Sequence, residues 1–248
     1  MACALAYVIF LQYLCGNFKE DVMNEHLIII ARARNGFTDK FGIPRQSREE
    51  SQIETRVVFE PEFRNPDALR GIEGYSHLWL IWGFSTNSNN LTVRPPRLGG
   101  NTRIGVFATR SPFRPNPIGL TSVRLLRVEN TTEGPVLAVS GADLLDGTPI
   151  YDIKPYLPYS DSHPEATNGF AEETIDYRLE VVFPEDDKPD IPAKITADLQ
   201  EILSQDPRPA YQDNPERVYK MDYAGYNIRF SVREDKLYVL NITKSDTK

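Results

Sequence analysis

The sequence predicts a mainly β protein whose C-terminal end forms a small α+β domain. Short segments rich in β-branched and aromatic residues recur between residues 27 and 183, bounded by Gly, Pro, Asn or Asp. No helical pattern of about 10–15 residues separates them, which favours a barrel or a sandwich over alternating strands and helices. Beyond residue 184, one amphipathic helix and two further strands are expected.

Strands of the first domain are expected at residues 27–31, 56–59, 78–82, 103–107, 123–128, 136–139 and 176–183. An acidic segment bracketed by Pro184 and Pro189 follows them and is typical of a linker. We therefore expect one domain over residues 23–183 and a second over residues 184–248.

The second domain begins with a helical pattern. Ile195, Leu199, Ile202 and Leu203 share one face of a helix of about three turns, and Pro192 suits the first turn of that helix. Residues 226–230 and 237–240 then read as two strands of a hairpin, joined by a turn at residues 233–236.

Residues 1–22 are left out of the predicted fold. Their apolar segment is too short to span a bilayer and lacks the basic residues that begin a secretory signal. We expect Met23 to be the functional start and residues 1–22 to be a non-native or disordered extension. A retained export or anchor segment is the alternative interpretation.

Neither composition nor spacing indicates a metal site. Both cysteines, Cys3 and Cys15, lie in the N-terminal extension, and His26, His77 and His163 are far apart. We expect a metal-free protein from a reducing compartment, the cytoplasm.

Positive charge is concentrated in one part of this acidic chain. The formal net charge is −7, yet residues 74–128 contain no Asp, Glu or Lys. The same segment contains seven arginines: Arg94, Arg97, Arg103, Arg110, Arg114, Arg124 and Arg127. They form either a face that binds phosphate or carboxylate through guanidinium forks, or outward side chains that pair with acids from the rest of the chain.

Two loop regions carry further signals. Gly and Pro are interleaved with arginine over residues 94–119, as expected of ordered loops that hold charged side chains in place and let a ligand approach the backbone. Farther on, Asp143, Asp146 and Asp152 lie close together in the sequence, and Asp146 followed by Gly147 is typical of a tight turn. The chain lacks GxGxxG, P-loop, GxSxG and HExxH motifs.

Seven motifs, taken in order, resemble the TsaA-like or TrmO family. They are PRQ at residues 44–46, GIEGYSHLW at 71–79, RPPRLGGN at 94–101, GVFATRSPFRPNPIG at 105–119, DGTP at 146–149, DIKPY at 152–156 and DPRPAY at 206–211. The resemblance runs from about residue 26 to 240. It implies a single-sheeted β-barrel methyltransferase that works as a homodimer. It also implies the reaction, methyl transfer from S-adenosylmethionine to N6 of threonylcarbamoyladenosine beside the tRNA anticodon.

The resemblance further implies a set of contacts to the cofactor. These residues are Pro44, Arg45, Gln46, Arg110, Leu120, Asp146, Gly147, Thr148 and Pro149. A turn with a carboxylate suits ribose hydroxyls and an adenine edge, and an arginine suits the cofactor carboxylate. The chain departs from the family at Ser85 and Thr86, where the family has His-Gln; both are kept as candidate contacts. The loop between Phe84 and Arg94 is also shorter than in enterobacterial members.

An anticodon loop presents phosphates and splayed bases. We expect Arg114, Lys154 and Tyr156 to contact it, with Arg114 or Lys154 opposite the carboxylate of the threonylcarbamoyl group and Phe113 and Tyr156 offering aromatic faces.

No catalytic general base is assigned. His77 and Asp152 are candidates, but a buried strand histidine bonded to a backbone carbonyl and one half of an ion pair are the ordinary interpretations of these residues. Two other functions stay open. One is a non-catalytic module that binds S-adenosylmethionine or a nucleotide in the same pocket. The other is a membrane-attached interaction protein that retains residues 1–22.

Overall fold

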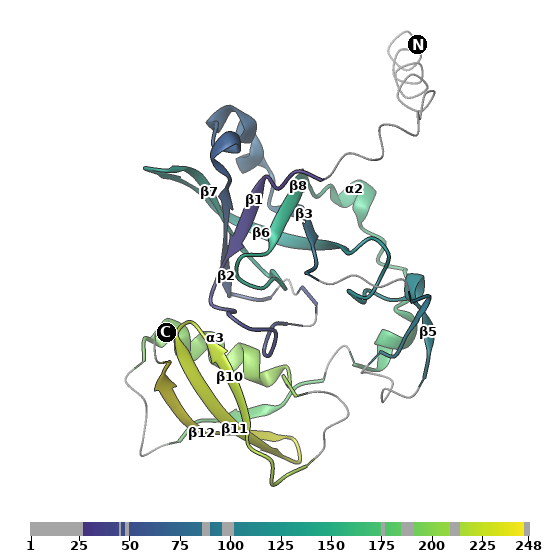
Figure 1. Cartoon of the computed structure of the whole chain (residues 1–248), viewed down its shortest axis with the longest axis vertical. Helices are drawn as coiled ribbons and strands as arrows, with labels where there is room; N and C mark the ends of the chain where they lie inside the picture. The colour runs from purple at the N-terminus through teal and green to yellow at the C-terminus, as the bar shows by residue number, and fades with distance from the viewer. Residues whose placement is uncertain are drawn as a thin grey trace.

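The protein consists of two β-rich parts stacked along its long axis (Figure 1). The computed structural model describes residues 27–44, 46–47, 50–85, 90–95, 102–174, 177–184, 191–208 and 214–245. The mainly β class is confirmed, with little helix. The expected N-terminal extension, residues 1–22, lies outside the described residues.

Six strands form a closed barrel in the order β1-β2-β7-β6-β3-β8. Their bounds are β1 Ala31–Arg34, β2 Glu54–Phe59, β3 His77–Gly83, β6 Ile118–Thr131, β7 Gly134–Ser140 and β8 Pro149–Pro155. Every neighbouring pair is antiparallel. Consequently β1, β3 and β7 end at the same end of the barrel at which β2, β6 and β8 begin. The connecting segments at this end are called the rim below.

The barrel core corrects one predicted strand. The sequence expectation for residues 27–31 overlaps β1 only at Ala31, and the side chains of Leu27 and Ile28 are more than half exposed. In β1 itself Ala31 and Ala33 point into the core while arginines alternate with them. Small alanines fit between the larger core side chains of the neighbouring strands. The strand therefore forms at residues 31–34, although residues 27–30 are more apolar.

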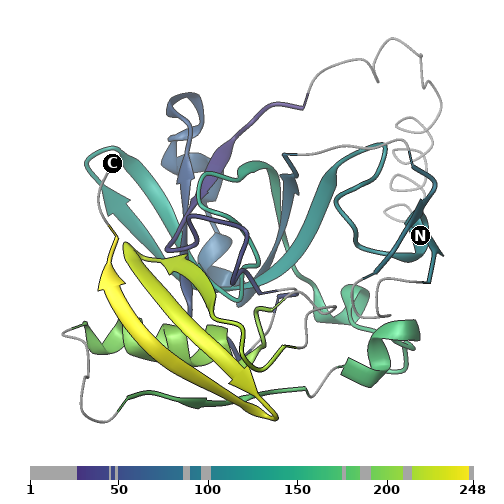
Figure 2. The same ribbon diagram turned by 60° about the horizontal axis from the view of Figure 1, so that its bottom comes forward.

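A four-stranded sheet and one helix make up the C-terminal part (Figure 2). The sheet has the order β10-β11-β12-β9, with β10 Tyr219–Tyr223, β11 Tyr226–Arg233, β12 Lys236–Lys244 and β9 Glu180–Val182. The predicted helix is α3, Ala193–Ser204, and its buried apolar side chains are Leu199, Ile202 and Leu203. The strand expected at residues 176–183 is the short β9, which pairs with β12 instead of joining the barrel.

The long loop between β1 and β2 belongs to both parts. Phe37 and Ile53, from the two ends of this loop, are buried in the same core as α3 and the C-terminal sheet. The backbone N–H of Ala224 donates to the carbonyl of Gly36 at 2.8 Å. The loop therefore joins the barrel rim to the C-terminal part through close packing.

The remaining elements are short. They are β4 Thr92–Val93, β5 Ile104–Gly105, α2 Pro158–Asp161 and the 3-10 turns Pro61–Phe63, Pro66–Leu69, Ile72–Gly74, Val106–Ala108 and Gly169–Thr174. The strand predicted at residues 103–107 is thus only two residues long, because a 3-10 turn begins at Val106. In the described part of the chain, no helix has the length and apolar content needed to cross a bilayer.

Candidate functional site

The rim gathers residues that are far apart in the sequence. Cofactor candidates come from the β1–β2 loop, the end of β3, the segment before β6, the start of β6 and the β7–β8 turn. In that order they are Pro44 and Gln46, Ser85, Arg110, Leu120, and Asp146 to Pro149. Arg45 and Thr86 lie outside the described residues. The antiparallel strand order brings these loops to one end of the barrel.

Two hydrogen bonds attach the β1–β2 loop to the segments around β6. Arg110 Nη1 donates to Gln46 Oε1 at 2.8 Å, which joins two of the predicted cofactor residues. Ser47 Oγ donates to the carbonyl of Ser122 on β6 at 2.7 Å. The first bond holds an exposed guanidinium beside an amide, and both groups can bond a polar ligand.

The β7–β8 turn is fixed against β1 through its backbone. The N–H of Gly147 donates to the carbonyl of Ala33 at 2.8 Å, and the N–H of Ala33 donates to the carbonyl of Thr148 at 3.0 Å. Gly147 has φ +79°, the left-handed conformation that favours glycine. A rigid turn of this kind holds its neighbour, Asp146, in one place.

Asp146 is oriented but not covered. Its Oδ1 accepts from the backbone N–H of Asn35 at 3.0 Å, while Oδ2 is 3.4 Å from Arg34 Nη1. The side chain of Asp146 is 33% exposed. One carboxylate oxygen is therefore engaged in the turn, and the other faces a single long ion pair, so Asp146 retains capacity to accept from a ligand hydroxyl.

A second aspartate lies beneath this site. Thr121 donates from Oγ1 to Asp143 Oδ1 at 2.6 Å and accepts from Trp82 Nε1 at 2.9 Å. Burial raises the pKa of Asp143, while the Thr121 hydroxyl and the charge of Arg110 act in the opposite direction. In the sequence, Asp143 stands out only as one of three nearby aspartates. Its place next to the strand that carries Leu120 follows from strand pairing, which no sequence motif encodes.

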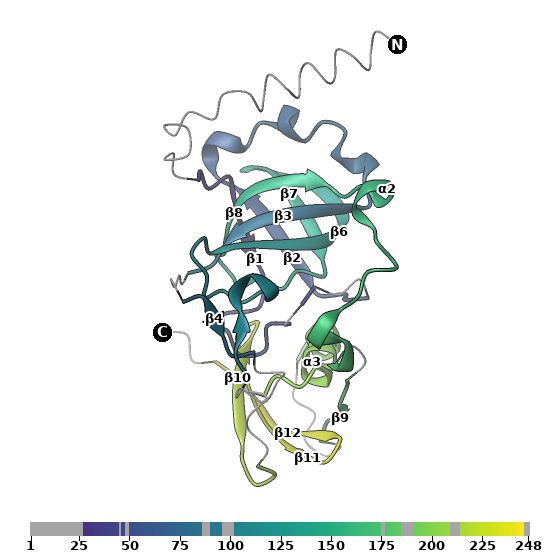
Figure 3. The same cartoon turned by 90° about the vertical axis from the view of Figure 1, so that its right-hand side faces the viewer.

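The outer face of β3, β6 and β8 carries one residue predicted to contact tRNA, Lys154, and a second, Tyr156, directly follows β8. Strand register places Leu120, Ile81 and Asp152 in one row across the three strands. The next row on the same face, two residues along and about 7 Å away, contains Ser122, Trp79 and Lys154. The strands that bear these rows can be followed in Figure 3. Leu120, which is 55% exposed, is therefore two strands across and one row along the sheet from Lys154.

Aromatic rings extend this face away from the rim. The ring of Tyr156 lies 5.4 Å from that of Trp79 and 6.1 Å from that of His77, measured between centroids. Trp79 Nε1 donates to Asp161 Oδ2 at 2.9 Å, which fixes the indole. The cluster is half-buried and can offer ring surface to a base.

Two predicted tRNA contacts and one candidate general base have partners within the protein. Arg114 Nη2 donates to the carbonyls of Val106 and Thr109, both at 3.3 Å, and so holds its own loop together. Lys154 Nζ lies 2.8 Å from Asp152 Oδ2, the ion pair that was the ordinary interpretation of Asp152. Both side chains of that pair stay exposed.

His77 is not the buried strand histidine bonded to a backbone carbonyl that was its ordinary interpretation. It is half-buried, and Nδ1 lies 2.9 Å from the hydroxyl of Ser76 instead of a backbone carbonyl. The side chain sits at the first residue of β3, where the preceding Ser76 is within reach.

The arginine-rich segment divides between the two interpretations. Arg127 pairs with Glu54 and Glu129, and its hydrogen bonds to these carboxylates raise its pKa. Arg103 instead bonds the hydroxyl of Thr92, and Arg94 is exposed. Arg97 lies outside the described residues. Arg127, on the hairpin of β6 and β7, therefore has a structural role, whereas Arg110 at the rim is bonded to a neutral amide. Among the described residues, no cluster of three or more His, Cys, Asp and Glu side chains could hold a metal ion.

Family models match both parts of the chain. The model of the tRNA-methyltransferase O N-terminal domain matches residues 32–162, and that of the TrmO C-terminal domain matches residues 179–245. The chain belongs to the TrmO family. The two matches fall on the barrel and on the C-terminal sheet with its helix.

Individual relatives agree with this assignment. A tRNA (adenine(37)-N6)-methyltransferase of Escherichia coli K12 is 37% identical over 212 residues, 81% of this chain and 90% of the relative. One from Eikenella corrodens is 47% identical over 165 residues, 64% of this chain and 92% of the relative. A crystal structure of TrmO from Pseudomonas aeruginosa matches with a TM-score of 0.69 at 33% identity, covering 89% of this chain and 99% of that one.

Proposed function

We propose that this TrmO-family chain is a tRNA (adenine-N6)-methyltransferase that uses S-adenosylmethionine to methylate adenosine 37, beside the anticodon. The nucleoside that it methylates is threonylcarbamoyladenosine. The observation that carries the proposal is the convergence at the rim of residues from separate loops, with Arg110 bonded to Gln46 and the Asp146 turn held rigid. The family match and the named relatives support the same reaction.

The rim residues suit the chemical groups of S-adenosylmethionine. The partly exposed carboxylate of Asp146 can accept from ribose hydroxyls. The guanidinium of Arg110, beside the Gln46 amide, can pair with the cofactor carboxylate. The exposed Leu120 gives an apolar surface for the adenine ring. Ser85, exposed after β3, supplies a hydroxyl where the family has a longer side chain.

Catalysis by this site depends on positioning. Bound S-adenosylmethionine supplies a methyl group that its sulfonium already activates. The residues of the chain bring the N6 nitrogen into line with that group, and orientation of this kind accounts for much of the rate in a displacement. Asp152 is held by Lys154, so we assign it no role in moving the N6 proton.

The outer face next to Leu120 is the proposed seat of the anticodon loop. Tyr156 with Trp79 offers aromatic surface. Lys154 offers a cation on the same face, two strands across and one row along from Leu120. Lys154 is the stronger candidate for the threonylcarbamoyl carboxylate, since its side chain stays 62% exposed within its ion pair to Asp152, while Arg114 Nη2 is bonded to loop carbonyls. Arg114 contributes its charge and the shape of its loop.

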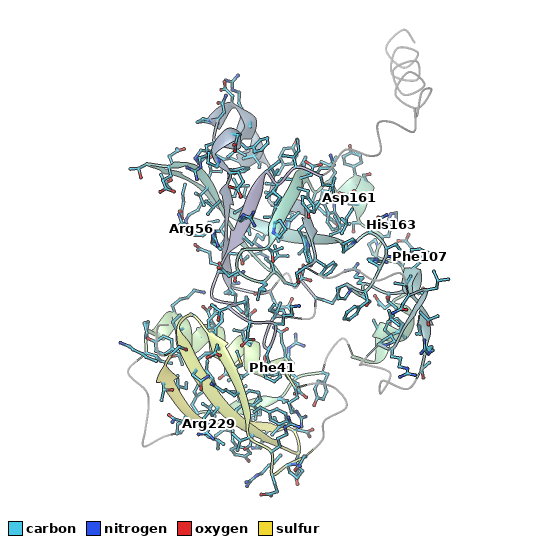
Figure 4. The ribbon with its side chains drawn as sticks, in the orientation of Figure 1. Phe41, Arg56, Phe107, Asp161, His163 and Arg229 are labelled. Atoms are coloured by element: carbon cyan, nitrogen blue, oxygen red, sulfur yellow. The ribbon has the colours of Figure 1, made fainter. Side chains whose placement is uncertain are left out.

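We also propose a homodimer formed by the loop region before and within the start of β6. This region exposes large apolar side chains, namely Leu91, Phe107, Phe113 and Ile118. Phe107, 80% exposed, lies in the segment to one side of the barrel in Figure 4. A second copy is the partner that the family resemblance implies, and the cytoplasm, where tRNA is modified, is its proposed location.

The domain organisation follows the same family pattern, with residues 1–22 as an extension. Because β9 pairs with β12, we propose that the boundary between the domains lies just before Leu179 instead of after residue 183.

The test is methylation of isolated tRNA. The protein is incubated with isotopically labelled S-adenosylmethionine and tRNA from a strain that lacks this gene, and nucleosides are then analysed by mass spectrometry. The expected product is threonylcarbamoyladenosine with one additional methyl group, absent when unmodified transcript is used. Arg110→Ala should lower the yield, whereas Arg70→Ala, exposed in the β2–β3 connection at the end of the barrel away from the rim, should not. Cofactor binding without any methylated nucleoside would instead favour a non-catalytic binding module.

A further inference from the structure

The loop after β1 inserts into the C-terminal core. Phe37 is fully buried there, with its ring centroid 5.1 Å from that of Tyr223. Phe41 packs against the same core and lies between the barrel and the C-terminal sheet in Figure 4. Burial of a phenylalanine at this level anchors the loop strongly to the C-terminal domain.

The same segment also holds Asp146. The N–H of Asn35 donates to Asp146 Oδ1 at 3.0 Å, and the N–H of Asp146 donates to the carbonyl of Phe37 at 2.9 Å. The side chain of Asn35 is itself fixed, because Nδ2 donates to the carbonyl of Leu144 and Oδ1 accepts from the N–H of Phe37, both at 2.9 Å. Residues 35 and 37 thus bond both the backbone and the carboxylate of Asp146.

Close packing fixes the other side of the segment. A Cβ on Gly36 would lie 2.8 Å from Tyr223 Cε2 and 3.1 Å from Ala224 Cβ. Tyr223 cannot move away easily, since its hydroxyl donates to Asp198 Oδ2 at 2.9 Å. Lys194 bonds both Asp198 Oδ1 at 2.7 Å and the carbonyl of Gln52 at 2.9 Å, which ties α3 back to the same loop.

We infer that residues 35–37 are a positioning segment through which the C-terminal domain sets the affinity of the rim for the methyl donor. The inference rests on the proposed function, because it assigns Asp146 to donor binding. A shift of this segment displaces the Asp146 carboxylate and its backbone together, so a preorganised contact becomes a loose one. Asn35 and Phe37 act through Asp146 and do not touch the donor themselves.

The first test uses Gly36→Ala in the full-length chain. The added methyl group pushes the segment away from Tyr223, and the dissociation constant for S-adenosylmethionine, measured by calorimetry, should rise on the order of tenfold. The KM for the donor should rise while the KM for tRNA stays unchanged. Hydrogen exchange of the Asp146 and Gly147 amides should be faster in the variant even without donor.

Gly74→Ala is the matched control. A Cβ at Gly74 meets nothing within 4 Å, and the residue precedes β3 at the end of the barrel away from the rim. Donor affinity and the exchange of both amides should equal those of the unmodified protein.

Distinct outcomes separate this inference from the proposed function. Folded Gly36→Ala with unchanged donor affinity and unchanged amide exchange overturns the inference and leaves the function intact. A parent protein that binds the donor but methylates no tRNA overturns the function while the affinity comparison still stands. If the parent binds no donor, both are overturned. Should Gly36→Ala fail to fold, Asn35→Ser takes its place, since it keeps an oxygen for the Phe37 N–H and loses the bonds from Nδ2 to Leu144 and Thr55. Unchanged donor affinity in this variant counts against the inference.

Discussion

Trp82 shows how one side chain restricts its neighbours near the rim. Its ring fills the space beside Gly119, where a Cβ would lie 2.2 Å from Trp82 Cε2, and its Nε1 donates to the Thr121 hydroxyl. Gly119 and Thr121 flank Leu120, so the exposed leucine is held in place by two buried contacts. The sequence shows the residues of this arrangement but not their pairing, since Trp82 and Thr121 are 39 positions apart.

Thr121→Val should destabilise the barrel and weaken donor binding. The replacement has a similar shape but removes the bonds to both Trp82 and Asp143, so the buried indole N–H loses its acceptor and the buried carboxyl group loses one of its donors. We expect a loss of about 1–3 kcal/mol in the free energy of unfolding, measured by urea denaturation. Thr132→Val, at an exposed turn, is the control and should change that free energy by less than about 0.5 kcal/mol. An equal effect at both positions would contradict the role of the buried network.

The hydrogen bonds of Asp161 predict how its contact with Trp79 depends on pH. Hydrogen bonds from the backbone N–H of Leu157 and from Trp79 Nε1 lower the pKa of this carboxyl group. A lowered pKa in the folded state means that the contribution to stability is present above the usual aspartate pKa and is lost as pH falls through the lowered value. The indole N–H resonance of Trp79 should therefore stay constant near neutral pH and shift only at acidic pH. A shift centred above the ordinary range of aspartate would contradict this assignment.

At the scale of elements, the β7–β8 turn depends on one backbone conformation. Gly147→Ala places a Cβ at φ +79°, which should cost about 1 kcal/mol of stability and loosen Asp146. Donor affinity should fall more than this loss of stability alone suggests, because the turn orients Asp146, the proposed contact to the ribose. Gly105→Ala, where a Cβ meets nothing within 4 Å and φ is negative, should leave both stability and donor affinity nearly unchanged.

The strands illustrate what sequence patterns can predict. Strands β3 and β7 were expected because each is apolar and bounded by turn residues, and the amphipathic helix was expected from its spacing. Strand β8 was not expected, because Asp152 and Lys154 face outward and make the segment look polar, although Ile150 is fully buried. Likewise the true β1 is an alternation of alanine and arginine that propensity alone ranks below the apolar residues before it.

The candidate site was predictable in part. The Asp146–Gly147 turn and the Arg110 loop have local signals, and the motif resemblance supplied the other candidates. The contacts of Asn35, Thr121 and Asp143 depend on which strands pair, so they appear only with the structure.

At the scale of the whole molecule, charge is arranged for a nucleic-acid partner despite the net charge of −7. Acidic residues are absent from residues 74–128, and Lys154 is exposed on the adjoining face of the barrel. Local positive charge of this kind attracts phosphate, while the acidic remainder limits binding to other surfaces.

Lys154→Ala should therefore weaken tRNA binding and leave donor affinity unchanged. If the lysine contacts a phosphate, the slope of log affinity against log salt concentration should fall by about 1. If it contacts the threonylcarbamoyl carboxylate, the loss should appear with modified tRNA and vanish with unmodified transcript. Equal tRNA affinity in variant and parent at every salt concentration would exclude both roles.

A crystal structure of the protein with S-adenosylhomocysteine, the demethylated product of the donor, would show whether the rim binds the donor. We expect the ligand at the barrel rim, between Arg110 with Gln46 on one side and Asp146 on the other, with its adenine against Leu120. Density for the ligand at any other place, in a protein that still methylates tRNA, would contradict this expectation.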